Sequence, residues 1–191
     1  MKKIILVLIF LLLTGCDYIE PDKLAIVSTI GIDYQKDYFY LTIEIEEVKT
    51  KDTESSYIIE VKSNSLNEAF NKINKSLDKT LYFANLDMLL LTPDALDAMD
   101  KIIKHINNDY QFSHHFNLAL VNNPHQIIDN MINKDLIAGY HLRNILKSKE
   151  HKNNDITYTK FLENYLDYKI ILPAIVPNKD LLNITLVEVI L

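Results

Sequence analysis

The feature that most constrains the fold of this chain is a change in hydrophobic period at Ser65. Residues 38–48 alternate between apolar and polar side chains, which predicts a strand with one face in the core and one in solvent. After Ser65 the apolar residues recur three or four positions apart, which predicts amphipathic helices. The chain therefore combines a sheet with helices that cover it.

The first part of the sequence predicts a three-stranded antiparallel meander. Residues 24–33 are rich in β-branched side chains, residues 38–48 alternate, and residues 57–62 form a third apolar run. The short polar segment 34–37 is typical of a hairpin turn, and the polar segment 49–55 is typical of a loop.

The rest of the chain predicts helix–strand–helix–strand units. Ser65 and Glu68 form a capping box that starts a helix over residues 66 to about 79. Capping residues followed by proline, Thr92-Pro93 and Asn123-Pro124, start two more helices. The fold class is α+β (mixed). The other expected elements are strands at 86–91 and 116–121, mostly helical structure over 139–169, a loop or edge segment bracketed by Pro173 and Pro177, and a closing strand at 182–191.

The apolar segment 182–191 would expose aliphatic side chains and an unpaired edge unless something covers it. Two interpretations follow from this pattern. Either the segment is the closing strand of the sheet, or the chain is cut where a further domain begins.

Composition excludes several functions. The 191 residues carry a net charge of −6, so an anionic lipid surface or a nucleic acid backbone is not expected to attract the domain. Cys16 is the only cysteine, so no disulfide can form within the chain and a packed core must supply the stability. The length suffices for one well-packed domain.

The N-terminus has the pattern of a bacterial lipoprotein signal. Lys2 and Lys3 precede nine apolar residues, a run too short to span a bilayer as a helix. The run closes on a lipobox, Leu13-Thr14-Gly15-Cys16, whose first three residues we expect the signal peptidase to recognise. Diacylglycerol on the Cys16 thiol supplies the two chains that a stable anchor needs. The alternative is an ordinary signal peptide or an uncleaved anchor.

These signals predict the domain organisation. Residues 1–15 form the signal peptide, residues 16–23 a membrane-proximal spacer, and residues 24–191 the folded domain. Because the stretch from Asp17 to Lys23 extends at most about 25 Å, the domain is expected to lie close to the membrane surface.

The chain resembles the Ger(x)C family, the lipoprotein C subunits of spore germinant receptors. The resemblance rests on the acid beside Cys16 and on four stretches of sequence: Leu24-Ala25-Ile26-Val27, Gly31-Ile32-Asp33, the segment from Glu68-Ala69-Phe70 to Leu81-Tyr82-Phe83-Ala84-Asn85-Leu86, and Phe116 to Val121. Family members are about twice this length, so the resemblance implies an N-terminal domain with the later domains absent.

The resemblance implies a non-enzymatic subunit on the extracytoplasmic side of the spore inner membrane. Its partners would be the polytopic A and B receptor subunits, bound by protein contacts, with no cofactor. The runner-up hypothesis is a small-molecule-binding or transporter-accessory lipoprotein, which an apolar pocket with a few convergent polar groups would favour.

The sequence offers little for catalysis. The six histidines have no ligand spacing, so solvent-facing or loop positions are expected for them, and no metal site is predicted. Glu44, Glu46, Glu47 and Glu60 are expected on the solvated face of the meander rather than as an acid–base pair.

The segment Tyr82, Phe83 and Asn85 allows two interpretations. Its aromatic residues either pack in the core or, with Asn85, form a protein-contact surface, since aromatic residues are enriched at interface anchors.

The lipobox leads to a direct prediction. Replacing Cys16 with alanine removes the thiol that accepts diacylglycerol, so the protein is expected to leave the membrane. Fractionation of cells and immunoblotting measure this. Continued tight attachment of the Cys16→Ala protein would contradict the lipid anchor.

Overall fold

The computed structural model describes residues 20–48, 54–109, 111–148, 156–165, 169–178 and 181–190. Its strands are β1 (Leu24–Gln35), β2 (Tyr38–Val48), β3 (Glu54–Ser63), β4 (Thr80–Tyr82), β5 (Met88–Leu91), β6 (Asn117–Leu120), β7 (Lys169–Asn178) and β8 (Leu181–Ile190). Its helices are the 3₁₀ turns η1 (Pro21–Lys23) and η2 (Pro93–Ala98) and the α-helices α2 (Leu66–Ser76), α3 (Met99–Asn108), α4 (Pro124–Ile132), α5 (Ala138–Lys147) and α6 (Tyr158–Tyr165).

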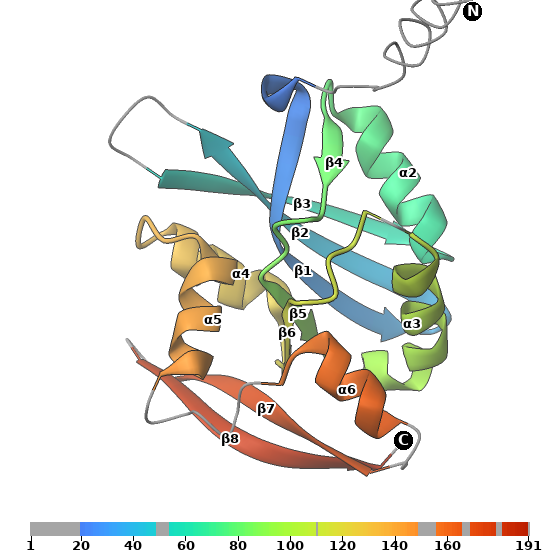
Figure 1. Cartoon of the computed structure of the whole chain (residues 1–191), viewed down its shortest axis with the longest axis vertical. Helices are drawn as coiled ribbons and strands as arrows, with labels where there is room; N and C mark the ends of the chain where they lie inside the picture. Colours follow the sequence, from blue (N-terminus) through green and yellow to red (C-terminus); the bar gives the residue numbers. More distant parts are fainter. Residues whose placement is uncertain are drawn as a thin grey trace, which may run out of the picture.

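One mixed sheet of eight strands organises the domain (Figure 1). The strand order is β3-β2-β1-β5-β6-β7-β8, and β4 pairs with the first part of β1. The pairs β1–β2, β2–β3 and β7–β8 are antiparallel, whereas β1–β5, β5–β6 and β6–β7 are parallel. The predicted meander and the mixed fold class are therefore confirmed.

The helices cover both faces of the sheet and give a three-layer domain (Figure 1). Helices α2, α3 and α6 pack on one face in a cluster that includes Leu89 and Leu118, and α4 and α5 pack on the other face against Leu90 and Ala119. Successive residues of β5 and β6 thus contribute to opposite cores. Strands buried on both faces read as continuous apolar runs, because neither face is solvated.

The predicted helix starts and the predicted hairpin turn are confirmed. The side chains of Ser65, Thr92 and Asn123 accept hydrogen bonds from backbone N–H groups three residues later, at 3.3, 3.2 and 3.1 Å. The β1–β2 hairpin turns at Lys36 and Asp37, whose φ angles of 50° and 63° suit a two-residue turn. The second predicted helix begins as the 3₁₀ turn η2 before it continues as α3.

The sequence missed one element, and one expectation about an element is wrong. The sequence did not predict β4, which is only three residues long and pairs with β1. Pro173 and Pro177 do not bracket a loop or an edge segment, because both lie inside β7, which pairs with β6 on one side and β8 on the other. Since β7 is registered with β6 only at Leu120 and Ala174, the missing proline N–H groups cost few ladder bonds.

The expectation that Glu44 faces solvent is also wrong. Glu44 is fully buried, and its carboxylate accepts hydrogen bonds from the hydroxyls of Thr29 (2.6 Å) and Ser56 (2.8 Å). It also accepts from the backbone N–H groups of Ala138 (2.7 Å) and Gly139 (3.1 Å) at the start of α5. These donors balance the cost of burying a charge, and the helix N-terminus favours a negative group.

Gly139 is required where α5 meets β1. The register of β1 against β2 shifts between Val27 and Thr29, around Ser28. A Cβ at Gly139 would overlap both the hydroxyl and the backbone carbonyl of Ser28. Glycine therefore allows the start of α5 to come within reach of Glu44.

Among the described residues, no helix is long and apolar enough to cross a membrane.

Replacing Glu44 with glutamine tests this arrangement. The amide nitrogen would face donors that now bind a carboxylate oxygen, so we expect the free energy of unfolding to fall by about 2–3 kcal/mol. Chemical denaturation measures the loss. The control Glu60→Gln changes a carboxylate whose side chain is 57% exposed and should stay within about 0.5 kcal/mol. Equal stability of the two variants would contradict the role of Glu44.

Candidate functional site

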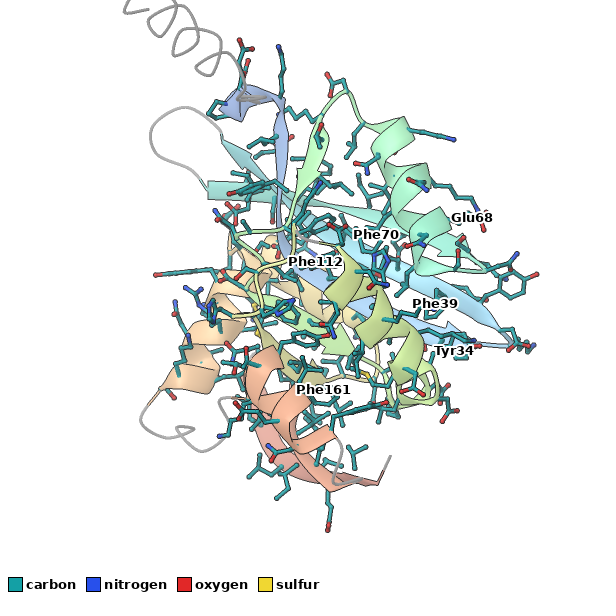
Figure 2. The ribbon with its side chains drawn as sticks, turned by 45° about the vertical axis from the view of Figure 1, so that its right-hand side comes forward. Tyr34, Phe39, Glu68, Phe70, Phe112 and Phe161 are labelled. Carbon is teal, nitrogen blue, oxygen red and sulfur yellow. The ribbon has the colours of Figure 1, made fainter. Side chains whose placement is uncertain are left out.

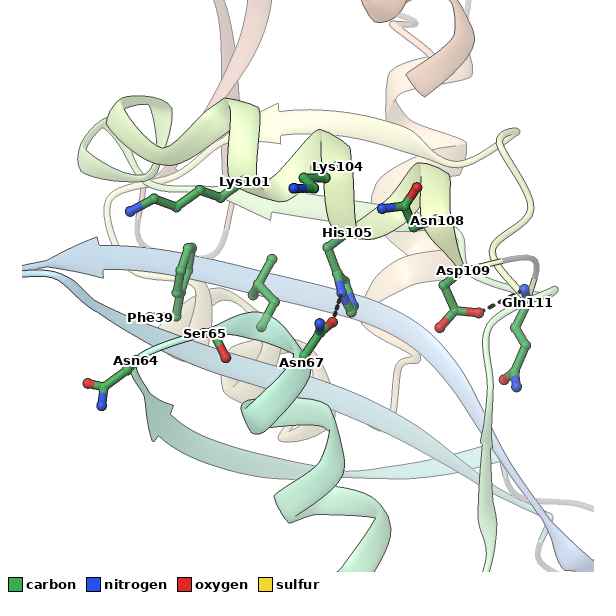
Figure 3. Close-up of a pocket in the computed structure, with 11 residues that line it drawn as sticks. Phe39, Asn64, Ser65, Asn67, Lys101, Lys104, His105, Asn108, Asp109 and Gln111 are labelled. Carbon is green, nitrogen blue, oxygen red and sulfur yellow. Dashed lines mark hydrogen bonds between the residues drawn. The ribbon is translucent and has the colours of Figure 1, made fainter.

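A groove between α2 and α3 hollows the described surface (Figure 3). It has a volume of about 810 Å³ and lies where the first turn of α2 faces the length of α3. Its floor contains the buried side chains of Phe39 and Leu66. Its polar lining consists of Asn64, Ser65, Asn67, Lys101, Lys104, His105, Asn108, Asp109 and Gln111.

Two lysines stand one turn apart on the α3 wall of the groove (Figure 3). The Nζ of Lys101 donates to the hydroxyl of Tyr34 at 2.9 Å, and this hydroxyl donates to Asp37 at 3.0 Å. The hydrogen bond to Tyr34 raises the pKa of Lys101, so this side chain keeps its charge at neutral pH. Lys104 adds a second exposed ammonium group to the same wall.

His105 lies in the middle of the groove, and its ring is partly buried against the core. Burial lowers the pKa of its imidazole, which is therefore neutral at pH 7. Its Nδ1 lies 2.6 Å from the Oδ1 of Asn67, and its ring stacks on Phe70 at a centroid distance of 4.9 Å. A neutral ring held on both sides positions the wall of the groove rather than supplying charge.

The groove is backed by an aromatic cluster in the core (Figure 2). Phe70 and Phe112 lie close together between α2 and the segment that follows α3. Phe83 stacks on Phe112 at 4.4 Å and meets Phe70 edge-on at 5.3 Å. Phe83 is only 3% exposed, so the contact role considered for it is wrong, and its role is core packing.

Tyr82 and Asn85 have different surroundings from Phe83. Tyr82 is half-buried at the end of β4, where it is registered with Ile26 of β1. Asn85 is exposed in the turn between β4 and β5. The structure therefore leaves these two residues accessible to a partner while Phe83 supports them from the core.

The motif Gly31-Ile32-Asp33 has a clear structural role at the end of β1. A Cβ at Gly31 would overlap Pro124 at the start of α4, and Ile32 is buried on the opposite face. The Asp33 carboxylate accepts from the hydroxyl of Thr92 at 2.6 Å. Because Thr92 caps η2, the motif fixes the start of the segment that leads into α3, one wall of the groove.

Among the described residues, no three His, Cys, Asp or Glu side chains come together in a way that could hold a metal ion. His114, His115 and His125 are exposed, as expected, and His125 lies 3.1 Å from Glu60. The expectation fails for His105, whose ring packs against the aromatic cluster. His151 lies outside the described residues.

The lipobox residues Leu13, Thr14, Gly15 and Cys16 also lie outside the described residues. The predicted roles of these four positions in cleavage and lipid attachment therefore stay predictions.

Sequence reasoning missed the groove lysines and Glu44. Lys101 and Lys104 lie on the polar side of the α3 pattern, which predicts only solvation. Glu44 sits in a polar position of an alternating strand, and alternation cannot show that α5 covers that face. Gly139 was a usable signal for a close approach between segments. It is one of only three glycines in the chain, and it lies in the first turn of α5, whose start has no capping side chain.

The fold and the surface define the structural class of the protein. It is a three-layer mixed α/β domain that carries a polar groove between two helices. The model of the spore germination protein N-terminal domain matches residues 17–177, and the chain belongs to this family. The match confirms the resemblance seen in the sequence. The family is a spore germination protein domain rather than a known enzyme family, which supports a germination-related role. No curated protein and no solved structure matches the chain significantly.

Shortening single side chains in the segment after α2 tests which of them belong to the core and which to the surface. Phe83→Ala removes a buried ring and should lower the free energy of unfolding by about 3–5 kcal/mol, whereas Asn85→Ala should change it by less than about 0.5 kcal/mol. Thermal and urea unfolding measure both. Phe83→Leu, which keeps an apolar side chain in the cluster, should lose less than Phe83→Ala. A destabilisation of Asn85→Ala as large as that of Phe83→Ala would refute this division.

Proposed function

We propose that this protein is a membrane-anchored lipoprotein subunit of a spore germinant receptor and acts in germination through protein–protein contacts. The observation that carries the proposal is the family match over residues 17–177, which begins directly after the lipobox cysteine. A germination domain joined to a lipid attachment signal suits a subunit that works beside the membrane.

The chemistry of the groove supports a role in protein–protein contact. The groove is open, its cations are exposed, and its one histidine is neutral and held by Asn67 and Phe70. None of the described side chains lining it forms a nucleophile–base pair of the kind that covalent catalysis uses. Amide and ammonium groups over an apolar floor suit recognition of another molecule by hydrogen bonds and charge.

The proposed partners are the polytopic A and B receptor subunits, and the proposed location is the extracytoplasmic side of the spore inner membrane. Both follow from the family resemblance and from the lipobox. The short spacer 16–23 would keep the groove and the Asn85 turn within reach of membrane proteins.

A second function, a small-molecule-binding or transporter-accessory lipoprotein, is favoured by one observation. The groove of about 810 Å³ has the size of many ligand sites and brings several polar side chains together over Phe39 and Leu66. It is lined by four amide side chains, which could recognise a polar solute.

Gene deletion and complementation in the spore former test the proposal. We expect deletion to slow or abolish germination with at least one nutrient and the wild-type gene to restore it. The double variant Lys101→Glu/Lys104→Glu should restore it poorly because the charge of the groove wall is reversed. The matched control Lys75→Glu/Lys160→Glu changes exposed lysines outside the groove and should complement fully.

Two outcomes decide between the hypotheses. In a subunit, the groove variant should reduce the amount of A and B subunits that copurifies with the protein from spore membranes. A small-molecule-binding protein that is not a receptor subunit would not copurify with the A and B subunits, in the wild type or in the variant. Unchanged germination with every nutrient, in a deletion strain without a related gene, would overturn the proposal.

A further inference from the structure

The imidazole of His105 has its two nitrogens in different surroundings. Nδ1 lies 2.6 Å from the Oδ1 of Asn67 in the first turn of α2, as Figure 3 shows. Because an amide oxygen only accepts hydrogen bonds, Nδ1 of the neutral ring carries the proton and Nε2 presents a lone pair. Nε2 is shielded from solvent and has no hydrogen-bond partner among the described residues. The ring is therefore satisfied at one nitrogen and unsatisfied at the other.

A small cavity behind the ring is apolar apart from His105 itself. The other residues that line it are aliphatic or aromatic and come from β1, β5, α2, α3 and the segments next to them, among them Ile30, Phe70 and Phe112. The cavity has a volume of about 10 Å³. A buried water needs roughly 10–15 Å³ and two to four polar partners, so this cavity cannot hold a water that satisfies the nitrogen.

A proton on Nε2 is costly in this position. The imidazolium places a second N–H and a positive charge against apolar side chains, and the N–H finds no acceptor among the described residues. Burial accordingly lowers the pKa of His105. The ring therefore fits its site only when it is neutral.

The charged groups near the ring do not remove this cost. Asp109, just after α3, favours the charged form, but its effect on the pKa of the ring is smaller than that of burial. The other charged residues within four positions of the ring on α3 are Lys101 and Lys104, and both are positive. On α2, Glu68 and Lys72 pair with each other at 2.8 Å, and the residues of β1 and β5 that line the cavity are apolar.

We propose that His105 is an acid-sensitive latch between the two walls of the groove. The neutral ring joins α3 to the first turn of α2 through Asn67, and it packs beside Phe70 and Phe112 at ring distances of 4.9 and 6.0 Å. In mildly acidic solution the imidazolium leaves this position for solvent, where water accepts its N–H groups. The hydrogen bond between α2 and α3 then breaks, and the groove widens at the Asn67 wall.

The pH range of the latch follows from the direction of the pKa shift. The pKa of His105 is lower in the folded than in the unfolded chain. The contribution of the neutral ring to stability is therefore complete above the unfolded value of about 6.5 and is lost progressively as the pH falls from there to the folded value. The effect on a partner rests on the proposed function, because it assumes that the partner binds in this groove. The latch itself is a property of the isolated protein.

Thermal unfolding of the full-length protein in detergent micelles tests the latch. Between about pH 7.5 and 5.5, the melting temperature of the wild type should fall more than that of His105→Phe, which keeps an aromatic ring beside Phe70 but takes up no proton. The matched control His115→Phe changes an exposed histidine and should show the same fall as the wild type. Equal falls in the wild type and in His105→Phe would overturn the proposal.

NMR of the wild type gives a second test that needs no variant. The imidazole of His105 should titrate at a lower pH than that of the exposed His115. Over the same pH range, amide exchange in residues 66–71 of α2 should accelerate by about tenfold relative to exchange in α4, which reports the general effect of pH. A titration at or above that of His115, or equal changes in α2 and α4, would refute the latch. Neither test involves a partner or a spore, so a failure of the proposed germination role would leave both results unchanged.

Discussion

The buried carboxylate of Glu44 is the interaction that fixes where α5 meets the sheet. It joins β2 to hydroxyls on β1 and β3 and to the first two N–H groups of α5. A carboxylate that is shielded from water needs hydrogen-bond donors from the protein. The four donors to Glu44 come from segments that are far apart in the sequence. The approach of α5 also requires Gly139 against Ser28, and the pair Arg143–Asp87 adds a second polar link between α5 and the sheet.

The other face of the sheet is organised by apolar packing and carries the groove. The end of β1 connects the two layers, since Gly31 accommodates α4 while Asp33 holds Thr92 at the start of the segment that leads to α3. The family motif therefore serves to position both layers. The aromatic cluster around Phe112 then supports the groove wall from below, so the surface available to a partner rests on a rigid core.

Much of the fold could be predicted from local patterns. The alternation over residues 38–48 and the capping residues Ser65, Thr92 and Asn123 each report a short-range physical preference, which the structure confirms. The candidate site was less accessible. Phe83 and Asn85 are two positions apart, yet one is core and the other surface, because α2, β4 and the segment after α3 meet around the Phe83 ring.

The sequence by itself determined the meander, the helix starts, the acidic charge and the lipobox pattern, because these depend on neighbours within a few residues. Only the tertiary structure decided that Glu44 is buried, that Lys101 and Lys104 face the first turn of α2 across a groove, and that β8 borders the sheet. The burial of a polar residue and the pairing of an edge depend on which distant segment covers them, and hydrophobic periodicity carries no record of that partner.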